Sequence, residues 1–130
     1  MKKTLLTILL SLIAAGYATA QRSQSVAIYV GQEKTVLHGL HLTFTEVVDD
    51  SRCPIGKVCV WAGNANVHID ASQGRDAAQT LELNSNLKPQ SVDYSGYRIK
   101  FVSLTRRPSK PGVMTMVRPK LVVRVTRIKR

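Results

Sequence analysis

Apolar and polar residues alternate along most of the chain from residue 25 onward. Successive side chains of a β-strand point to opposite faces, so a period of two is typical of a strand with one buried face. No stretch after residue 20 shows a convincing helical period. The sequence therefore predicts an all-β fold, and the alternation is found in residues 25–30, 39–48, 60–71, 79–84, 97–101 and 121–125.

Turn-forming residues separate these segments. Glycine, serine, asparagine and proline gather at residues 31–32, 72–75, 84–86, 95–96 and 108–112. Six or seven short strands, each with one apolar face, favour an antiparallel β-sandwich with an immunoglobulin-like layout. A small β-barrel has the same periodicity and remains the alternative. The longest irregular stretch, residues 105–119, is either a mobile basic loop or contains a short strand at residues 113–117.

The first twenty residues have the pattern of a secretory signal peptide. Two lysines precede an apolar core at residues 5–15, and Ala18-Thr-Ala20 is a small-x-small cleavage site. We expect cleavage after Ala20, which leaves a single β-rich domain at residues 21–130 in the periplasm or outside the cell. No cysteine lies near this position, so no lipid anchor is expected, and no other segment is apolar for long enough to cross a bilayer.

Both cysteines and the only tryptophan occur in residues 50–64, DSRCPIGKVCVWAGN. Structural zinc sites usually need four ligands, and a thioredoxin-type site needs CxxC beside a βαβ unit; neither pattern is present. An exported chain with two cysteines more simply forms one disulfide, here Cys53–Cys59. We expect a strand to begin directly after this bridge, with Trp61 on its inward face packed near the disulfide.

Asp50, Ser51 and Arg52 precede the first cysteine, and their side chains suit two roles. As turn formers, they would bond backbone amides or each other. Alternatively, they form a loop that contacts a ligand, because binding residues are often carried on loops.

This stretch resembles the signature of a group of small exported bacterial proteins. The shared residues are Asp50-Ser-Arg-Cys-Pro, a second cysteine after four further residues, and then Val-Trp-Ala-Gly-Asn. The similarity extends over about residues 36–125, and this motif is its only specific part. The resemblance implies export, a disulfide and a β-rich domain, but no activity. Some members are lipoproteins, and this chain departs from them because it lacks the lipid-attachment cysteine.

Positive charge is concentrated in the last quarter of the chain. The net charge of +11 falls to +9 once Lys2 and Lys3 are removed with the signal peptide, and residues 98–130 contain eleven basic residues and no acidic one. If residues 97–104 and 120–128 pair as antiparallel strands, four cations share one outward face and four in the connecting loop extend it. The predicted polyanion- or partner-binding residues are thus Arg98, Lys100, Lys120, Arg124, Arg106, Arg107, Lys110 and Arg118.

A basic face of this kind suggests an anionic partner in the cell envelope, such as lipopolysaccharide, acidic phospholipid or cell-wall polymer. Nucleic acid is not the expected partner, because the compartment is wrong and aromatic residues for base stacking are lacking. Two alternatives remain open. In the first, the charge only keeps the protein soluble; in the second, the protein is an exported inhibitor or accessory protein that binds a partner through loops at one end.

Catalytic and metal sites have little support. No Gly-x-Ser-x-Gly elbow or phosphate-binding glycine loop occurs, so we expect neither enzyme activity nor a cofactor. His41, His68 and Asp70 fall on the polar faces of predicted strands. They would form a copper or zinc site only if those strands were neighbours in a suitable register, and unrelated surface positions are the simpler interpretation.

Overall fold

The computed structural model describes residues 22–37, 39–106 and 118–128, and these residues form an all-β fold without a helix. None of them forms a helix that could span a membrane. The expected signal peptide, the turn at residues 108–112 and the strand considered at residues 113–117 lie outside the described residues. The eight strands are β1 (Ser23–Tyr29), β2 (Glu33–Val36), β3 (Leu40–Asp50), β4 (Ala65–Gln73), β5 (Gln79–Asn84), β6 (Ser91–Tyr94), β7 (Tyr97–Leu104) and β8 (Lys120–Arg127).

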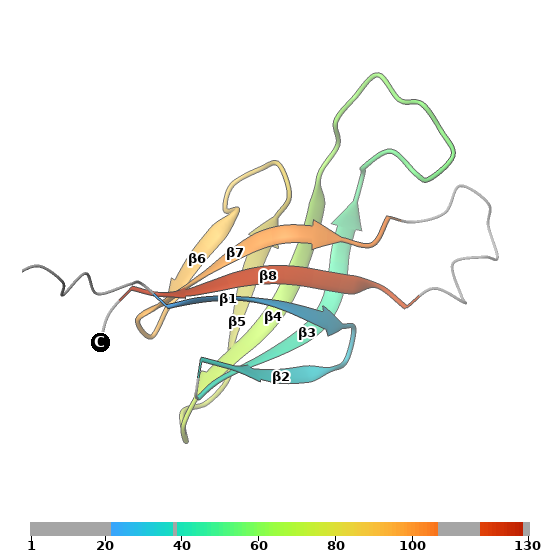
Figure 1. The fold of residues 1–130 in the computed structure, drawn as a ribbon. Coiled ribbons are helices and arrows are strands. Elements are labelled where there is room, and N and C mark those ends of the chain that lie inside the picture. The colour runs from blue at the N-terminus through green and yellow to red at the C-terminus, as the bar shows by residue number, and fades with distance from the viewer. Residues whose placement is uncertain (1–21, 38, 107–117, 129–130) are drawn as a thin grey trace, which may run out of the picture.

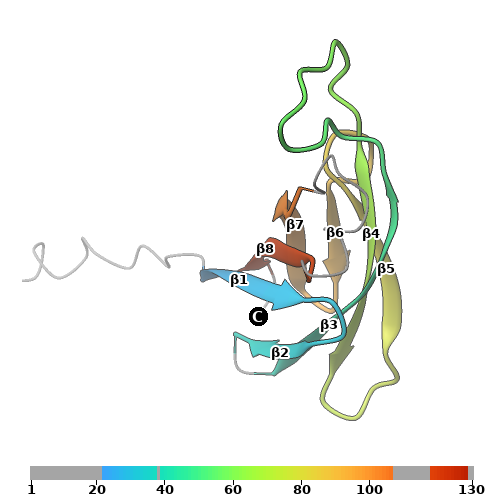
Figure 2. The same ribbon diagram turned by 90° about the vertical axis from the view of Figure 1, so that its right-hand side faces the viewer.

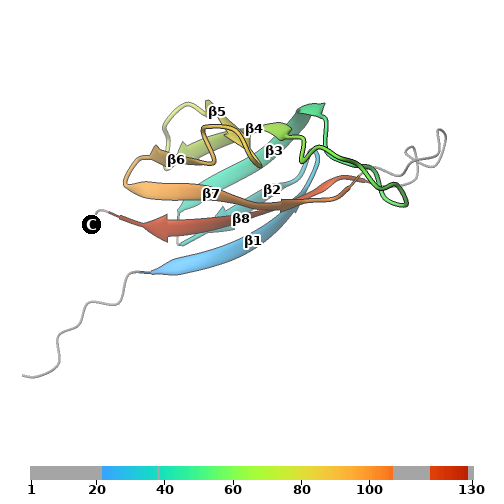
Figure 3. The same ribbon diagram turned by 90° about the horizontal axis from the view of Figure 1, so that it is seen from above.

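The strands form two antiparallel sheets of four, with the orders β1-β8-β7-β6 and β2-β3-β4-β5. The two sheets lie face to face as separate layers, as the view from above shows most clearly (Figure 3). The chain starts in one sheet, crosses to the other after β1, and returns between β5 and β6 (Figure 1). The predicted β-sandwich is confirmed, and the sheets do not close into the barrel considered as the alternative.

The core lies between the sheets and is built by the alternating residues. In one sheet Ile69 on β4 lies between Phe44 on β3 and Leu81 on β5. In the other, Val123 on β8 lies between Val26 on β1 and Phe101 on β7. Burying such side chains is the main favourable term in folding, at about 25 cal/mol per Å² of apolar surface. The buried apolar residues are Val26, Ile28, Val36, Leu40, Leu42, Phe44, Ala65, Val67, Ile69, Ala71, Leu81, Leu83, Tyr97, Ile99, Leu104, Leu121, Val123 and Val125.

The strand predictions differ from the structure at three places. The prediction of a strand over residues 60–71 was wrong at its start, because β4 begins only at Ala65. Trp61 is not on an inward face; it is 57% exposed and precedes the strand. Two short strands, β2 and β6, were not predicted individually, because each has four residues and their outward positions are exposed to solvent.

Candidate interaction surfaces

The four cations predicted to share one face do so. β7 and β8 are antiparallel neighbours, with Lys100 opposite Arg124 and Arg98 opposite Thr126. Arg98, Lys100, Lys120 and Arg124 are exposed, whereas Tyr97, Ile99, Leu121, Val123 and Val125, which alternate with them, are buried. We call the outward side of the β1-β8-β7-β6 sheet, which carries these four residues, the basic face.

The centre of the basic face is a row of polar side chains across all four strands. Ser25 lies opposite Arg124, Arg124 opposite Lys100, and Lys100 opposite Ser91. Directly opposite residues on one face of a sheet have Cβ atoms about 5 Å apart. The row thus brings a guanidinium and an ammonium group together between two hydroxyl groups, and all four are donors suited to an anion.

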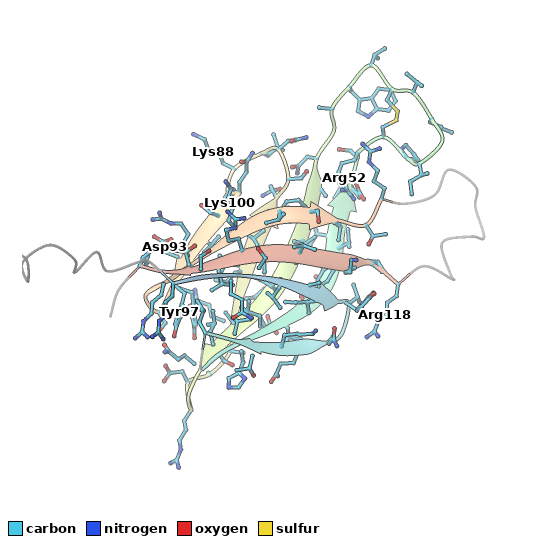
Figure 4. The ribbon with its side chains drawn as sticks, viewed as in Figure 1. Arg52, Lys88, Asp93, Tyr97, Lys100 and Arg118 are labelled. Atoms are coloured by element: carbon cyan, nitrogen blue, oxygen red, sulfur yellow. A yellow bond between two sulfur atoms is a disulfide. The ribbon has the colours of Figure 1, made fainter. Side chains whose placement is uncertain are left out.

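Lys100 and Arg124 have no carboxylate within ion-pair distance among the described residues. Arg98 differs from them, because its Nε donates to Asp93 Oδ1 at 2.8 Å and its Nη2 donates to Asp93 Oδ2 at 3.2 Å. This hydrogen bonding, together with the charge of Asp93, raises the pKa of Arg98. The charge of Arg98 is therefore largely matched by Asp93, whereas Lys100, Lys120 and Arg124 have no ion pair with a carboxylate among the described residues; Asp93 and Lys100 are labelled in Figure 4.

The predicted cations of the β7–β8 connection divide into three groups. Arg118 donates to the carbonyl of Val30 from Nε at 3.0 Å and from Nη2 at 2.6 Å, and it lies 5.6 Å from the centre of the Tyr29 ring. These contacts tie the start of β8 to the end of β1 (Figure 4). Arg106 is exposed at the end of β7. Arg107 and Lys110 lie outside the described residues.

Acidic residues lie mainly in the other sheet. Of the eight acids in the chain, only Asp93 belongs to the sheet that carries the basic face. The other seven occur on β2, β3, β4 and β5 or in the β4–β5 turn, at Glu33, Glu46, Asp49, Asp50, Asp70, Asp76 and Glu82. The sandwich is therefore electrically polarised, with one basic sheet and one acidic sheet.

The histidines do not converge with Asp70. His41 Nδ1 lies 3.4 Å from Glu33 Oε1 and His68 Nδ1 lies 3.3 Å from Glu46 Oε1, so each histidine pairs with its own glutamate. Asp70 instead accepts a hydrogen bond from the Thr80 hydroxyl at 2.7 Å. The described part of the chain contains no group of three or more histidine, cysteine, aspartate or glutamate residues that could hold a metal ion.

The predicted disulfide between Cys53 and Cys59 is present. It lies within the connection between β3 and β4, residues 51–64, which we call the disulfide loop. This loop extends beyond the ends of the strands at one end of the sandwich, as two perpendicular views show (Figures 1 and 2). The bridge therefore closes a projecting loop and does not pack in the core.

Asp50 and Arg52 fix the base of this loop. Their ion pair uses two parallel contacts of 2.9 Å, from Arg52 Nε and Nη2 to the two carboxylate oxygens. Arg52 also donates to the carbonyls of Leu104 at 2.9 Å and Thr105 at 3.1 Å, which attaches the loop to the end of β7. The two side chains are only 14% and 13% exposed. The prediction that Asp50 and Arg52 bond to each other is thus confirmed. Little of either side chain is exposed for contact with a ligand.

Ser51 connects the two ends of the disulfide loop. Its amide donates to the carbonyl of Asn64 at 2.9 Å, and its carbonyl accepts the indole Nε1–H of Trp61 at 3.0 Å. Gly63 passes so close that an added Cβ would lie 2.3 Å from the Ser51 carbonyl oxygen. The φ angle of Gly63 is +68°, a left-handed conformation that glycine adopts without steric cost. Trp61 and Gly63 therefore stabilise the loop through contacts with Ser51, and they are not part of the core.

Asn64 joins the disulfide loop to the β5–β6 connection. Its Oδ1 accepts the backbone amides of Asn86 at 2.9 Å and Leu87 at 3.0 Å, and its Nδ2 donates to Asn84 Oδ1 at 2.8 Å. Asn86 Nδ2 in turn donates to the carbonyl of Gly63. One amide side chain thus satisfies three polar groups on a neighbouring segment. Sequence reasoning missed this role, because none of these partners is near Asn64 in sequence.

The tip of the loop exposes large apolar side chains. Val58 and Val60 are fully exposed, while Ile55 is 54% and Trp61 57% exposed. Lys57 lies among them and is also exposed. Sequence reasoning missed this feature, because the apolar residues at 58–61 were interpreted as the start of a buried strand.

Two features of the described surface are thus candidates for binding: the row of donors across the basic face and the apolar tip of the disulfide loop. Comparison with protein-family models, curated proteins and solved structures found no match to this chain.

Proposed function

We propose that this protein is an exported, non-catalytic β-sandwich that binds an anionic component of the cell envelope through its basic face. The observation that carries the proposal is the placement of Lys100 directly opposite Arg124, without a carboxylate partner among the described residues. Like charges directly opposite each other on a sheet are destabilising, and a bound anion removes that cost.

The distribution of the acids supports the same proposal. Seven of the eight acidic residues belong to the opposite sheet or its turn, so the field of the molecule directs the basic face toward a negatively charged surface. The hydroxyls of Ser25 and Ser91 flank the two cations and add neutral donors for phosphate or carboxylate oxygens. This arrangement matches a repeating anionic surface, such as lipid headgroups, better than it matches a single small anion.

Two observations support export. The disulfide fits an oxidising compartment, where such bonds form and persist. The first twenty residues have the pattern of a signal peptide, and the motif resembles that of exported bacterial proteins. We therefore place the protein in the periplasm or outside the cell.

The test compares two double variants that remove the same amount of charge. Lys100→Gln/Arg124→Gln neutralises the row on the basic face, and Lys34→Gln/Arg75→Gln neutralises two exposed cations of the other sheet and its turn. Binding of the oxidised protein, residues 21–130, is measured against anionic vesicles and lipopolysaccharide across a salt series. We expect binding that weakens with salt, because exposed charges are screened beyond about 10 Å at 0.1 M salt.

The expected result is that the first variant loses most of this binding and the second retains it. Equal losses in both variants would show that net charge, and not the basic face, attracts the protein. If wild-type protein binds neither surface near physiological salt, the proposal is wrong, and the cations then serve solubility.

A further inference from the structure

We propose that the disulfide loop inserts its apolar tip into the interface of an anionic lipid bilayer. This inference rests on the proposed function, because it identifies the anionic surface as a membrane. The loop provides Ile55, Val58, Val60 and Trp61 as exposed apolar side chains on one short segment. Exposed apolar groups that gather in one place mark an interaction surface, whereas scattered ones do not.

The position of the tip suits a flat partner. The loop extends past the ends of both sheets, so a surface approaching this end of the sandwich meets the tip before it meets the strands (Figures 1 and 2). The disulfide constrains the loop internally, and the hydrogen bonds of Arg52 and Asn64 hold its base. Little conformational entropy is then lost when the tip is immobilised in a membrane.

The charges around the tip favour an anionic lipid as the partner. No acidic residue occurs between Asp50 and Asp70, and Lys57 is at the tip itself. The loop also stands at the end of the sandwich where β7 finishes and β8 begins, since Arg52 contacts the carbonyls of Leu104 and Thr105. Exposed Arg106 and Lys120 are at this same end. An apolar tip that carries Lys57, at an end of the sandwich that also carries Arg106 and Lys120, is complementary to acyl chains beneath a layer of phosphate groups.

The chemistry of the tip also sets the depth of insertion. An open loop cannot satisfy its own backbone N–H and C=O groups in hydrocarbon, so deep insertion is excluded. Tryptophan with a partly bonded indole prefers the headgroup region, where one edge is apolar and the other is hydrated. We therefore place Trp61 near the headgroups and the two valines just below it.

The only tryptophan of the chain makes the experiment direct. Oxidised protein, residues 21–130, is titrated with vesicles of phosphatidylcholine alone and of phosphatidylcholine mixed with phosphatidylglycerol. The readouts are the emission wavelength of Trp61 and its quenching by lipids brominated on the acyl chains. We expect a blue shift and shallow quenching only with the anionic vesicles.

The loop variant is Val58→Asn/Val60→Asn, which changes two fully exposed side chains and leaves the core intact. Because partial insertion buries apolar surface of both valines, replacing them with asparagine predicts about tenfold weaker binding. The matched control is Val48→Asn, because Val48 is 48% exposed on β3 outside the loop. We expect the control to bind as the wild type does.

The outcomes separate this inference from the proposed function. If vesicle binding depends on Lys100 and Arg124 but neither Trp61 emission nor the loop variant changes it, the basic face acts alone and the inference is overturned. Binding to lipopolysaccharide but not to lipid vesicles overturns it in the same way. If the loop variant loses affinity for a protein partner while vesicles leave Trp61 emission unchanged, the tip is a protein-docking element and the inference is also overturned.

Discussion

Arg52 donates from Nη1 to the backbone carbonyl of Leu104 at 2.9 Å, across 52 positions of sequence. The same guanidinium forms a two-point ion pair with Asp50. One side chain thus connects the disulfide loop to the end of β3 and to the end of β7. The strands β3 and β7 belong to different sheets. The disulfide joins two residues within the loop, whereas Arg52 fixes the loop to the sandwich.

Replacing Arg52 with lysine should destabilise the protein although the charge is kept. Lysine cannot pair with Asp50 at two points and reach the carbonyls of Leu104 and Thr105 at the same time. We expect Arg52→Lys to lower the free energy of unfolding by about 1–3 kcal/mol, measured by urea denaturation. The control is Arg124→Lys on the exposed basic face, where a change within about 0.5 kcal/mol is expected. Equal effects would show that the contacts of Arg52 add little.

Gly63 should tolerate no side chain. Its φ angle is +68°, and an added Cβ would meet the Ser51 carbonyl at 2.3 Å. Gly74 has a similar φ of +60°, but nothing lies within 4 Å of an added Cβ there. Gly74→Ala should therefore cost about 1 kcal/mol from backbone strain alone, and Gly63→Ala should cost clearly more. Thermal unfolding of both variants tests this, and similar losses would contradict the close approach.

Removing the disulfide should loosen the loop without unfolding the sandwich. The bridge closes a loop of six positions outside the core. In the chain-entropy model this closure is worth about 2 kcal/mol, so Cys53→Ala/Cys59→Ala should lower the melting temperature but keep the β-sheet circular dichroism at room temperature. Loss of that β-sheet signal would show that the bridge supports the core.

Arg124→Glu should stabilise the free protein and weaken its binding to anionic surfaces. The change replaces a like-charge pair by an opposite-charge pair with Lys100, which lies directly opposite. Such cross-strand pairs contribute about 0.2–1 kcal/mol, so the free energy of unfolding should rise by an amount in that range. Arg124→Gln, which only removes the repulsion, should fall between the wild type and Arg124→Glu. A destabilised Arg124→Glu variant would contradict this account of the basic face.

The alternating segments were sufficient to predict the fold class, because burial on one side of a sheet leaves a period of two in the sequence. They did not determine which strands are neighbours; the shared face of Lys100 and Arg124 was expected only on the condition that β7 and β8 pair, and the structure meets that condition. They did not reveal that Asp93 would be placed beside Arg98: the turn at residues 95–96 was identified, but the four-residue strand β6 that precedes it was not predicted.

The disulfide loop shows where local sequence patterns mislead. Val58, Val60 and Trp61 were expected to open a strand, yet they are exposed on a loop. The close approach of Gly63 to Ser51 and the hydrogen bonds of Asn64 to the β5–β6 connection end the loop, and β4 starts at Ala65. The hydrogen bonds of Asn64 are made with residues distant in sequence, so no local pattern predicts them.

In the disulfide loop, the residues that make the contacts at the base are different from the two valines exposed at the tip. The base of the loop is held by contacts of Asp50, Arg52, Gly63 and Asn64. Val58 and Val60, in contrast, are fully exposed and lie outside the core. Substitutions of Val58 and Val60 therefore leave the contacts at the base of the loop unchanged. Such a scaffold lets the contact chemistry of the tip be diversified, by evolution or by a protein engineer, while the sandwich beneath it stays the same.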